Sequence, residues 1–169
     1  MESALLVQSL ALHGELLALA FEGLTEDELR FRPTPEAWSP LEILGHLVDE
    51  EHGDFRVRLG LTLEDPDAPW PRIDPQGWVR QRKHQERIPA ELLAEFHEER
   101  RRSLDWLREL RDPDWDRAHA HPELGPLRAG DLLASWAAHD VLHLRQLAGT
   151  RLAYLRQASL PYSAAYAGA

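Results

Sequence analysis

Apolar residues recur three and four positions apart over most of the chain, and no stretch alternates as a half-buried strand would. This pattern predicts an all-α protein whose long helices span residues 3–22, 39–61, 89–111 and 129–148. Four such helices suit an up-down four-helix bundle. The length is that of one ordinary domain and no repeat is visible, so we expect a single domain over residues 1–169.

The second helix has the clearest start. Ser39 and Glu42 form an S-x-x-E capping box, and Pro40 suits the first helical position. Trp38 and Ile43 have the spacing of a hydrophobic staple across this start. The helix is therefore predicted to begin at Ser39.

Signals elsewhere set the other boundaries. A second capping box, Thr25 with Glu28, predicts a short helical turn over residues 25–30. Gly23 and Gly149 are expected to end the first and fourth helices. A proline-rich connection over residues 64–77 separates the second and third helices, and we expect a crossover or a lid there, with a short helix around residues 78–87.

Two further segments are not expected to form long helices. Residues 119–126 are expected to form a loop in which His119 and His121 are exposed. The last twenty residues are too apolar for a disordered tail, with Tyr154, Leu160 and Tyr162 among them. We expect this segment to pack on the bundle or on a partner subunit, and the surplus of apolar surface predicts a homodimer.

Composition narrows the classes of function. With 29 acidic and 19 basic residues the formal charge is −10, which disfavours nucleic-acid phosphates and anionic membranes as partners. No uninterrupted run reaches 18 apolar residues and the N-terminus lacks the basic region of a signal peptide, so a cytoplasmic location is expected. The chain has no cysteine, so any metal must be held by His, Asp or Glu.

The fourth helix contains the most informative polar residues. His139 and His143 are four positions apart, which places both imidazoles on one side of a helix and within reach of one ion. Nine histidines would give roughly half of one such pair by chance, so the spacing alone is weak. Both lie on the inward stripe, with Asp140 beside it, and this orientation leaves metal ligation and a merely hydrogen-bonded buried pair open.

The second helix offers further ligands. His46 and Glu50 are also four positions apart, at the edge of the apolar stripe. Asp49, Glu51 and Asp54 follow in a run that we interpret as a solvated acidic face.

These motifs together resemble a known family. The segment 38–47, WSPLEILGHL, and the later H-D-x-x-H-L-x-Q pattern at 139–146 are similar to the DinB-like superfamily of metal-binding four-helix bundles. Further similarity lies in L-L-x-x-F-x-x-x-R at 92–100, Asp114-Trp115 and Gly125-Pro126, so the resemblance covers roughly residues 5–149.

The resemblance implies a site in which His46, His139 and His143 bind a divalent ion, zinc or nickel first, with manganese or iron as alternatives. Family members of known activity are typically transferases that add bacillithiol or mycothiol to small electrophiles, and others are described as metal-dependent hydrolases. A thiol would have to arrive as a co-substrate, because the chain has no cysteine.

Three neutral imidazoles leave the ion its full charge, which lowers the pKa of a bound thiol or water. We therefore expect an enzyme acting on a small molecule, with transfer of a low-molecular-weight thiol as the leading hypothesis. Arg100 and Arg145 are candidates for holding the thiol, although a solvated position is the simpler interpretation of each.

Two alternatives to thiol transfer stay open. Hydrolysis would use Glu50 or Asp140 as general base to a metal-bound water. A non-catalytic stress-response bundle would use the ion only to join two helices.

Overall fold

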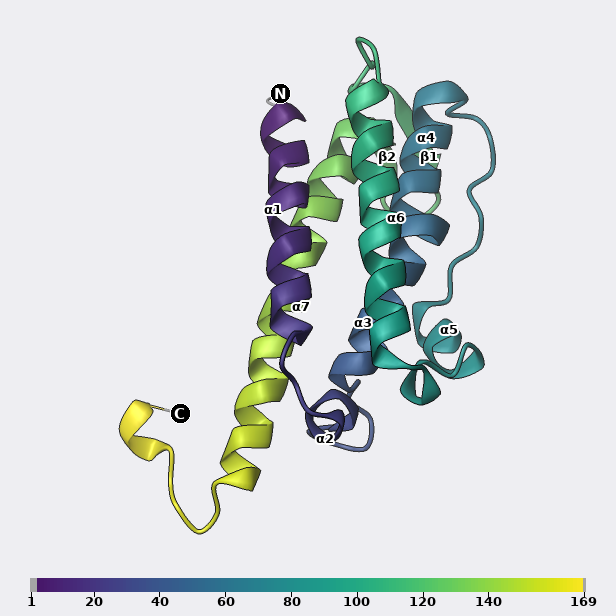
Figure 1. Cartoon of the computed structure of the whole chain (residues 1–169). Helices are drawn as coiled ribbons and strands as arrows, with labels where there is room; N and C mark the ends of the chain where they lie inside the picture. Colours follow the sequence, from purple (N-terminus) through teal and green to yellow (C-terminus); the bar gives the residue numbers. More distant parts are fainter. Residues whose placement is uncertain (1–2, 169) are drawn as a thin grey trace.

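The protein is a bundle of four long helical segments (Figure 1), seen in a computed structural model that describes residues 3–168. The segments are α1 (Ser3–Phe21), α3 (Pro40–Glu50) continued by a π-helical turn η1 (Glu51–Phe55) and α4 (Arg56–Glu64), α6 (Pro89–Glu109), and α7 (Ala129–Ala158). A short helix, α2 (Glu26–Arg30), follows α1. The prediction of an all-α four-helix bundle is confirmed.

The long connection is a crossover. Arg56 pairs with Glu99, and Gly60, four residues later, lies against Trp106. Residue numbers rise together along the two segments, so α3–α4 and α6 run in the same direction. The chain must therefore return to the starting end after α4, which it does through residues 65–74 (Figure 1). There it forms α5 (Pro75–Gln81) and the 3-10 turn η2 (His84–Glu86), where a short helix was predicted. The α1 and α7 helices form the other parallel pair. The up-down order expected from the sequence is therefore wrong, because the crossover returns the chain to its starting end before α6 begins.

Both predicted capping boxes are present. The Ser39 side chain accepts a hydrogen bond from the Glu42 backbone at 3.2 Å, and the Glu42 carboxylate accepts one from the Ser39 backbone at 2.9 Å. Thr25 and Glu28 make the equivalent pair at the start of α2. These reciprocal bonds satisfy backbone N–H groups that have no partner inside the helix.

A layer of buried polar groups divides the hydrophobic core. Leu17, Leu44 and Phe96 belong to one buried cluster, and Leu10 and Trp136 to the other. On α6 and α7 the buried Arg100, Asp140 and His143 fall between the positions that belong to these two clusters. The buried acidic residues 49–54 do so on the segment from α3 to α4. Helix α3 reaches this layer and is buried at all eleven of its residues, so it has no solvent edge.

The segment predicted as an open loop is a hairpin of β1 (Ala118–His121) and β2 (Gly125–Arg128). The expected exposure is wrong for both histidines, which are half-buried. The His119 ring stacks on Trp70 with centroids 4.2 Å apart and its Nδ1 lies 2.8 Å from the Pro66 carbonyl, and the His121 Nδ1 accepts from the backbone N–H groups of Glu123 and Leu124. Four-residue strands are too short to show alternation, and the residues that cover this hairpin come from the distant crossover.

Helix α7 continues past Gly149 to Ala158, ten residues beyond the predicted end. Tyr154 packs edge-on against Phe31, with centroids 5.3 Å apart, so tertiary contact supports the extra turns. Beyond Ala158 the chain leaves the bundle (Figure 1), so the expectation that this segment packs on its own bundle is wrong. Packing on a partner subunit stays a prediction.

Helix α1 is unusually apolar for a surface helix. Its most apolar 18-residue window has a mean hydropathy of 1.6 and is only 28% buried, so by length and composition it could span a membrane. Counting uninterrupted apolar residues did not reveal this, because Gln8, His13 and Glu15 interrupt the run. Such helices also occur in protein cores and interfaces.

Candidate metal centre

The three histidines expected from sequence meet in the polar layer. His46 comes from α3, and His139 and His143 come from adjacent turns of α7. The Nε2 atom of His139 lies 3.3 Å from that of His46 and 3.1 Å from that of His143. Among residues 3–168, this is the group of His, Asp and Glu whose ligand atoms all lie within 4.8 Å of one another.

These distances fit a shared divalent ion. With metal–nitrogen bonds of 2.0–2.1 Å, two imidazole nitrogens on one ion lie about 3.0 Å apart in octahedral and about 3.3 Å apart in tetrahedral geometry. The Nε2 atom of His139 has this spacing to the Nε2 atoms of both His46 and His143, which come from two helices. Nitrogen lone pairs that face each other so closely are stabilised by a cation between them. The three imidazoles therefore fit a divalent metal ion.

Burial keeps the imidazoles in the form that binds metals. Removal from water, reinforced by the neighbouring histidines, lowers the pKa of His46 to about 2 and that of His139 to about 3. The pKa of His143 is also lowered by burial. All three rings are therefore neutral near pH 7, as metal ligation requires.

Neighbouring side chains orient the ligand rings. The Nδ1 atom of His143 lies 2.8 Å from the Gln146 side-chain oxygen. The Nδ1 atom of His46 faces the Glu50 carboxylate at 3.6 Å. The partner at Nδ1 directs the Nε2 lone pair of His143 at the common centre. The buried Nδ1 of His46 makes no hydrogen bond, and the Glu50 carboxyl is the group that faces it.

Glu50 is the buried carboxylate beside this centre. Its Oε1 has no hydrogen-bond partner, and burial together with Asp54 raises the pKa of its carboxyl to about 9. It lies on the Nδ1 side of His46, which suits a residue that positions the ring. Its predicted role as general base stays a prediction.

Two aromatic rings flank the histidines. The Trp38 ring lies 4.8 Å from that of His46, and the Phe55 ring lies 5.2 Å from that of His139. Of the three ligands only His139 is partly exposed, so the centre opens to solvent on its side. Phe55 was not identified from the sequence; it belongs to the π-helical turn, a feature often found at functional sites.

The acidic run is not a solvated face, and that interpretation is wrong. Asp49, Glu51 and Asp54 are all buried, with exposures of 2%, 1% and 7%. Asp49 pairs with His84 at 2.8 Å, and Asp54 pairs with Arg58 at 2.9 Å. The partners of Asp49 and Glu51 come from distant segments, which the local sequence could not show, whereas Arg58 is four positions from Asp54 on the same segment.

Glu51 belongs to a buried cluster around Arg100. The Arg100 guanidinium donates to Asp140 through two nitrogens at 2.7 and 2.8 Å, to Glu51 at 2.7 Å and to the Leu10 carbonyl at 2.7 Å. The Trp136 indole N–H also donates to Glu51, at 3.2 Å. We call these residues the Arg100 cluster.

The Arg100 cluster corrects two predicted roles. Arg100 is 4% exposed and its N–H groups are all engaged, so the structure does not place it to hold a thiol. Asp140 is fully buried and bound to that guanidinium, so it is not placed as a general base at the histidines. Arg145, the other thiol candidate, is exposed on α7.

His84 is a supporting residue that the sequence did not identify. Its buried ring bonds Asp49 and lies directly over Gly45, where a Cβ would overlap it. A glycine inside a well-capped helix was the available signal for this close approach. The contact fixes α3 one residue before His46.

Comparison with known proteins agrees with this architecture. A relative from Oceanobacillus iheyensis, "Putative metal-dependent hydrolase OB0782", is 25% identical over 111 residues, which are 65% of this chain and 63% of that protein. The chain thus matches less than two thirds of that relative's length.

A solved structure shares the fold. YfiT from Bacillus subtilis, described as "a probable metal-dependent hydrolase with an unusual four-helix bundle topology", superposes with a TM-score of 0.78 at 21% identity, over 88% of this chain and 85% of that chain. The model of the DinB superfamily matches residues 9–147. The chain therefore belongs to the DinB superfamily.

Proposed function

We propose that this protein is a metal-dependent enzyme that acts on a small molecule, with His46, His139 and His143 holding one divalent ion. The observation that supports this most directly is the convergence of three neutral imidazoles, in which the Nε2 atom of His139 lies 3.3 Å from that of His46 and 3.1 Å from that of His143. An all-imidazole donor set favours zinc, nickel or iron over manganese, which prefers carboxylate oxygens. Both similar proteins are described as metal-dependent, which agrees with this proposal.

The chemistry follows from the donor set. A divalent ion held by three uncharged ligands lowers the pKa of a bound water or thiol toward neutrality. The protein supplies the rest: Gln146 and Glu50 orient the imidazoles, and Trp38 and Phe55 exclude water from two sides of the site.

Hydrolysis is the reaction that we favour over thiol transfer. A transferase must hold an ionised co-substrate, but the arginines suggested for that role are engaged in the core or exposed on α7. A water nucleophile needs no such holder. Both similar proteins are also described as hydrolases, although neither description names a substrate. A cytoplasmic location stays a prediction from the sequence.

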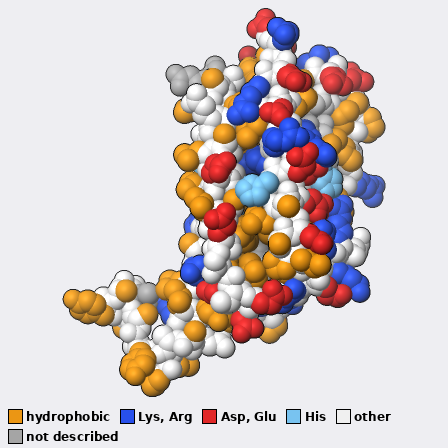
Figure 2. Space-filling view, viewed as in Figure 1, with side chains coloured by type: hydrophobic (Ala, Val, Ile, Leu, Met, Phe, Trp, Pro, Cys, Tyr) orange, Lys and Arg blue, Asp and Glu red, His pale blue; other side chains and the backbone are white. Residues whose placement is uncertain are grey.

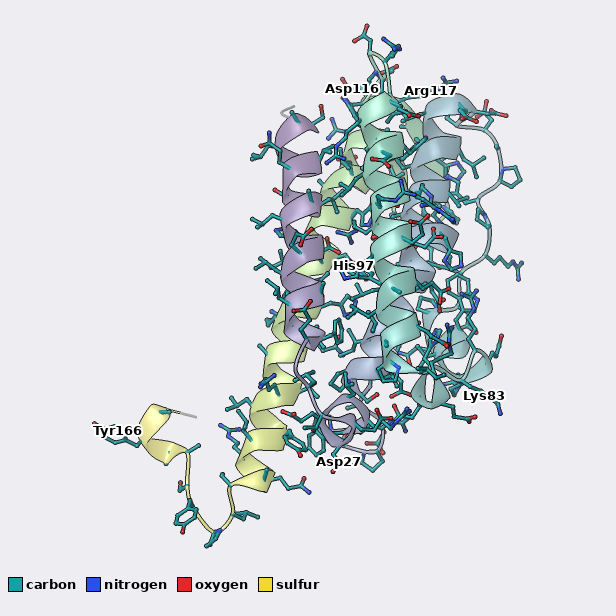
Figure 3. All side chains as sticks on the ribbon, in the orientation of Figure 1. Asp27, Lys83, His97, Asp116, Arg117 and Tyr166 are labelled. Carbon is teal, nitrogen blue, oxygen red and sulfur yellow. The ribbon has the colours of Figure 1, made fainter. Side chains whose placement is uncertain are left out.

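The first experiment measures metal content and activity together. Wild-type protein, His143→Ala and the control His97→Ala are purified untagged and analysed for bound metals, and His97 is an exposed histidine of α6 (Figure 3). We expect about one divalent ion per chain in the wild type and the control, and none in His143→Ala.

The same three proteins are then assayed on a panel of small esters, amides and lactones, with and without added low-molecular-weight thiols. Metal-dependent cleavage without thiol supports the proposal. Turnover that requires an added thiol would contradict hydrolysis and would indicate a thiol transferase. A bound metal that affects only thermal stability would indicate the non-catalytic bundle, and no uptake of zinc, nickel or iron would refute the metal site itself.

A further inference from the structure

The C-terminal segment, residues 159–168, carries apolar side chains into solvent. Leu160, Tyr162 and Tyr166 are 71%, 80% and 105% exposed. Figure 3 shows Tyr166 far from the bundle. The segment contains no Asp, Glu, Lys or Arg, in a chain of formal charge −10. We call it the C-terminal arm. An uncharged arm with exposed aromatic residues is typical of a segment that packs against another surface.

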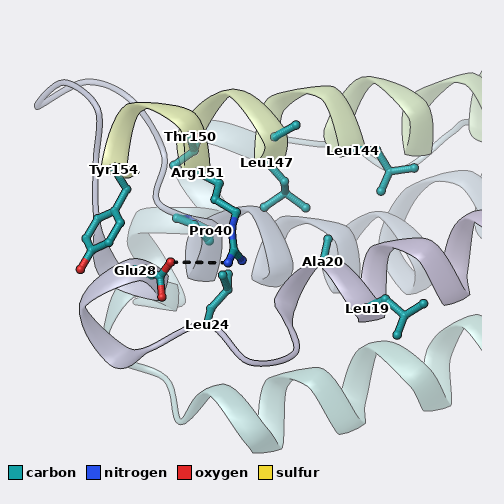
Figure 4. Close-up of a pocket in the computed structure, with 11 residues that line it drawn as sticks. Leu19, Ala20, Leu24, Glu28, Pro40, Leu144, Leu147, Thr150, Arg151 and Tyr154 are labelled. Atoms are coloured by element: carbon teal, nitrogen blue, oxygen red, sulfur yellow. Dashed lines mark ion pairs between the residues drawn. The ribbon is translucent and has the colours of Figure 1, made fainter. Parts of the chain in front are cut away.

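A pocket lies at the same end of the bundle. It encloses about 310 Å³ between α1, α2, the start of α3 and α7 (Figure 4). Its lining is mainly apolar and includes Leu19, Leu24, Leu144, Leu147 and Tyr154. The pair of Glu28 and Arg151, 3.9 Å apart, is the charged part of the lining, and the two charges offset each other. The pocket therefore suits uncharged, apolar side chains.

Helix α1 continues this apolar surface away from the pocket. Leu5, Leu12, Leu16 and Leu19 are between 41% and 60% exposed. Figure 2 shows hydrophobic side chains along α1 and again over the protruding arm. A water-soluble monomer rarely exposes so much contiguous apolar surface.

We propose that the chain forms a two-fold homodimer in which the C-terminal arm of each copy occupies the pocket between α1 and α7 of the other. Leu160 and Tyr162 are the anchoring side chains. The arm does not lie on its own bundle, so arm and pocket are both unpartnered within one copy. Because they lie at the same end, one two-fold axis beside that end satisfies both exchanges at once.

A second copy fits this surface better than a lipid bilayer does. Helices that lie on membranes carry Lys or Arg on their polar face, and α1 carries neither. The chain's net negative charge also disfavours anionic headgroups. An exchanged arm requires only apolar contact, which the pocket and the arm both supply.

The first test compares two leucines of equal exposure. Leu160 is 71% exposed on the arm, and Leu124 is 69% exposed in the hairpin at the opposite end of the bundle. Light scattering of the full chain over a concentration series should give a dimer for the wild type and Leu124→Asp. Leu160→Asp should raise the dimer dissociation constant at least about tenfold, with an unchanged helical circular dichroism spectrum. A monomeric wild type, or equal effects of the two substitutions, would overturn the proposal.

The absence of cysteine allows a direct test of which chain supplies the arm. The double variant Ala148→Cys, Ala165→Cys places one thiol in the pocket and one on the arm. Mild oxidation should give a disulfide-linked dimer on a non-reducing gel, and the control pair Ala148→Cys, Leu124→Cys should not.

Other outcomes of this test contradict the proposal. An oxidised monomer with an internal disulfide would show that the arm folds onto its own pocket. A monomer that sediments with phosphatidylcholine vesicles would assign the apolar surface to a membrane. Neither outcome affects the proposed metal site, because the histidines take no part in this surface.

Discussion

The Arg100 cluster and the histidine triad are both buried polar groups in the layer between the two hydrophobic clusters, but they differ in completeness. In the Arg100 cluster the guanidinium meets two carboxylates and a carbonyl, and an indole N–H donates to one of the carboxylates. In the triad three nitrogens of the same kind face one another, and each ring has its other nitrogen directed elsewhere. In the first cluster the protein itself supplies the opposite charges, with Oε2 of Glu51 as the oxygen that lacks a hydrogen bond, whereas the second suits a cation.

This difference separates structural from functional burial. A buried charge that is paired with an opposite charge holds segments together. Removing one partner leaves the other charge buried and uncompensated, which destabilises the fold. A buried set of lone pairs without donors between them is costly unless something binds there. The same layer therefore contains a structural ion-pair cluster around Arg100, which acts as a brace between helices, and a binding site formed by the three histidines. Composition alone does not distinguish the two.

The largest expected effect tests the brace. Arg100→Met leaves Glu51 and Asp140 buried without their cation, and should lower the free energy of unfolding by about 3–5 kcal/mol. Urea denaturation measures this change. Arg101→Met, at an exposed neighbouring arginine, should change stability by less than about 0.5 kcal/mol. Equal effects would contradict the assignment of Arg100 as a brace.

Next in size is the loss of the metal site. In His143→Ala, added zinc or nickel should no longer raise the free energy of unfolding, whereas wild type should gain about 2.7 kcal/mol at a hundredfold excess over the dissociation constant. Thermal or chemical denaturation with and without the ion measures this difference. If the ion stabilises both proteins equally, the triad is not its site.

A smaller effect is expected from the residue behind His46. Glu50→Gln removes the carboxylate that faces the ring's Nδ1 and should weaken metal binding about 10–100-fold, while stoichiometry stays the same. Competition with a chelator of known affinity measures the change. Glu99→Gln, at a half-buried carboxylate of α6 that pairs with Arg56, is the matched control and should leave the affinity unchanged.

The last effect is gradual and depends on pH. Burial keeps the pKa of His139 at about 3 in the folded state, against 6.5 for the ordinary group. Between these values the unfolded chain binds more protons, so this residue's contribution to stability is lost as pH falls below 6.5. In metal-free protein, the stability of wild type relative to His139→Gln should fall by up to about 1.4 kcal/mol per pH unit. A pH-independent difference would mean that the ring is solvated.

Local patterns in the sequence predicted much of this fold. The capping boxes at Ser39 and Thr25 fixed helix starts because their partners lie three residues away. Helical spacing likewise put His139 and His143 on one side of α7, and the resemblance added His46. The pairing of Asp49 with His84 and of Glu51 with Arg100 could not be predicted, because these partners lie 35 and 49 positions away, in the connection after α4 and on α6.

By itself, the sequence determined the four helices, the exclusion of cysteine chemistry and the placing of His139 and His143 on one side of a helix, and the family resemblance added His46. Periodicity and capping are local properties, so a single chain is enough to find them. The tertiary structure decided which acidic residues are buried, that Arg100 braces the core, and that the C-terminal arm stands free. Those features depend on which segments face each other across the bundle, because a buried charge is stable only when its distant partner completes it.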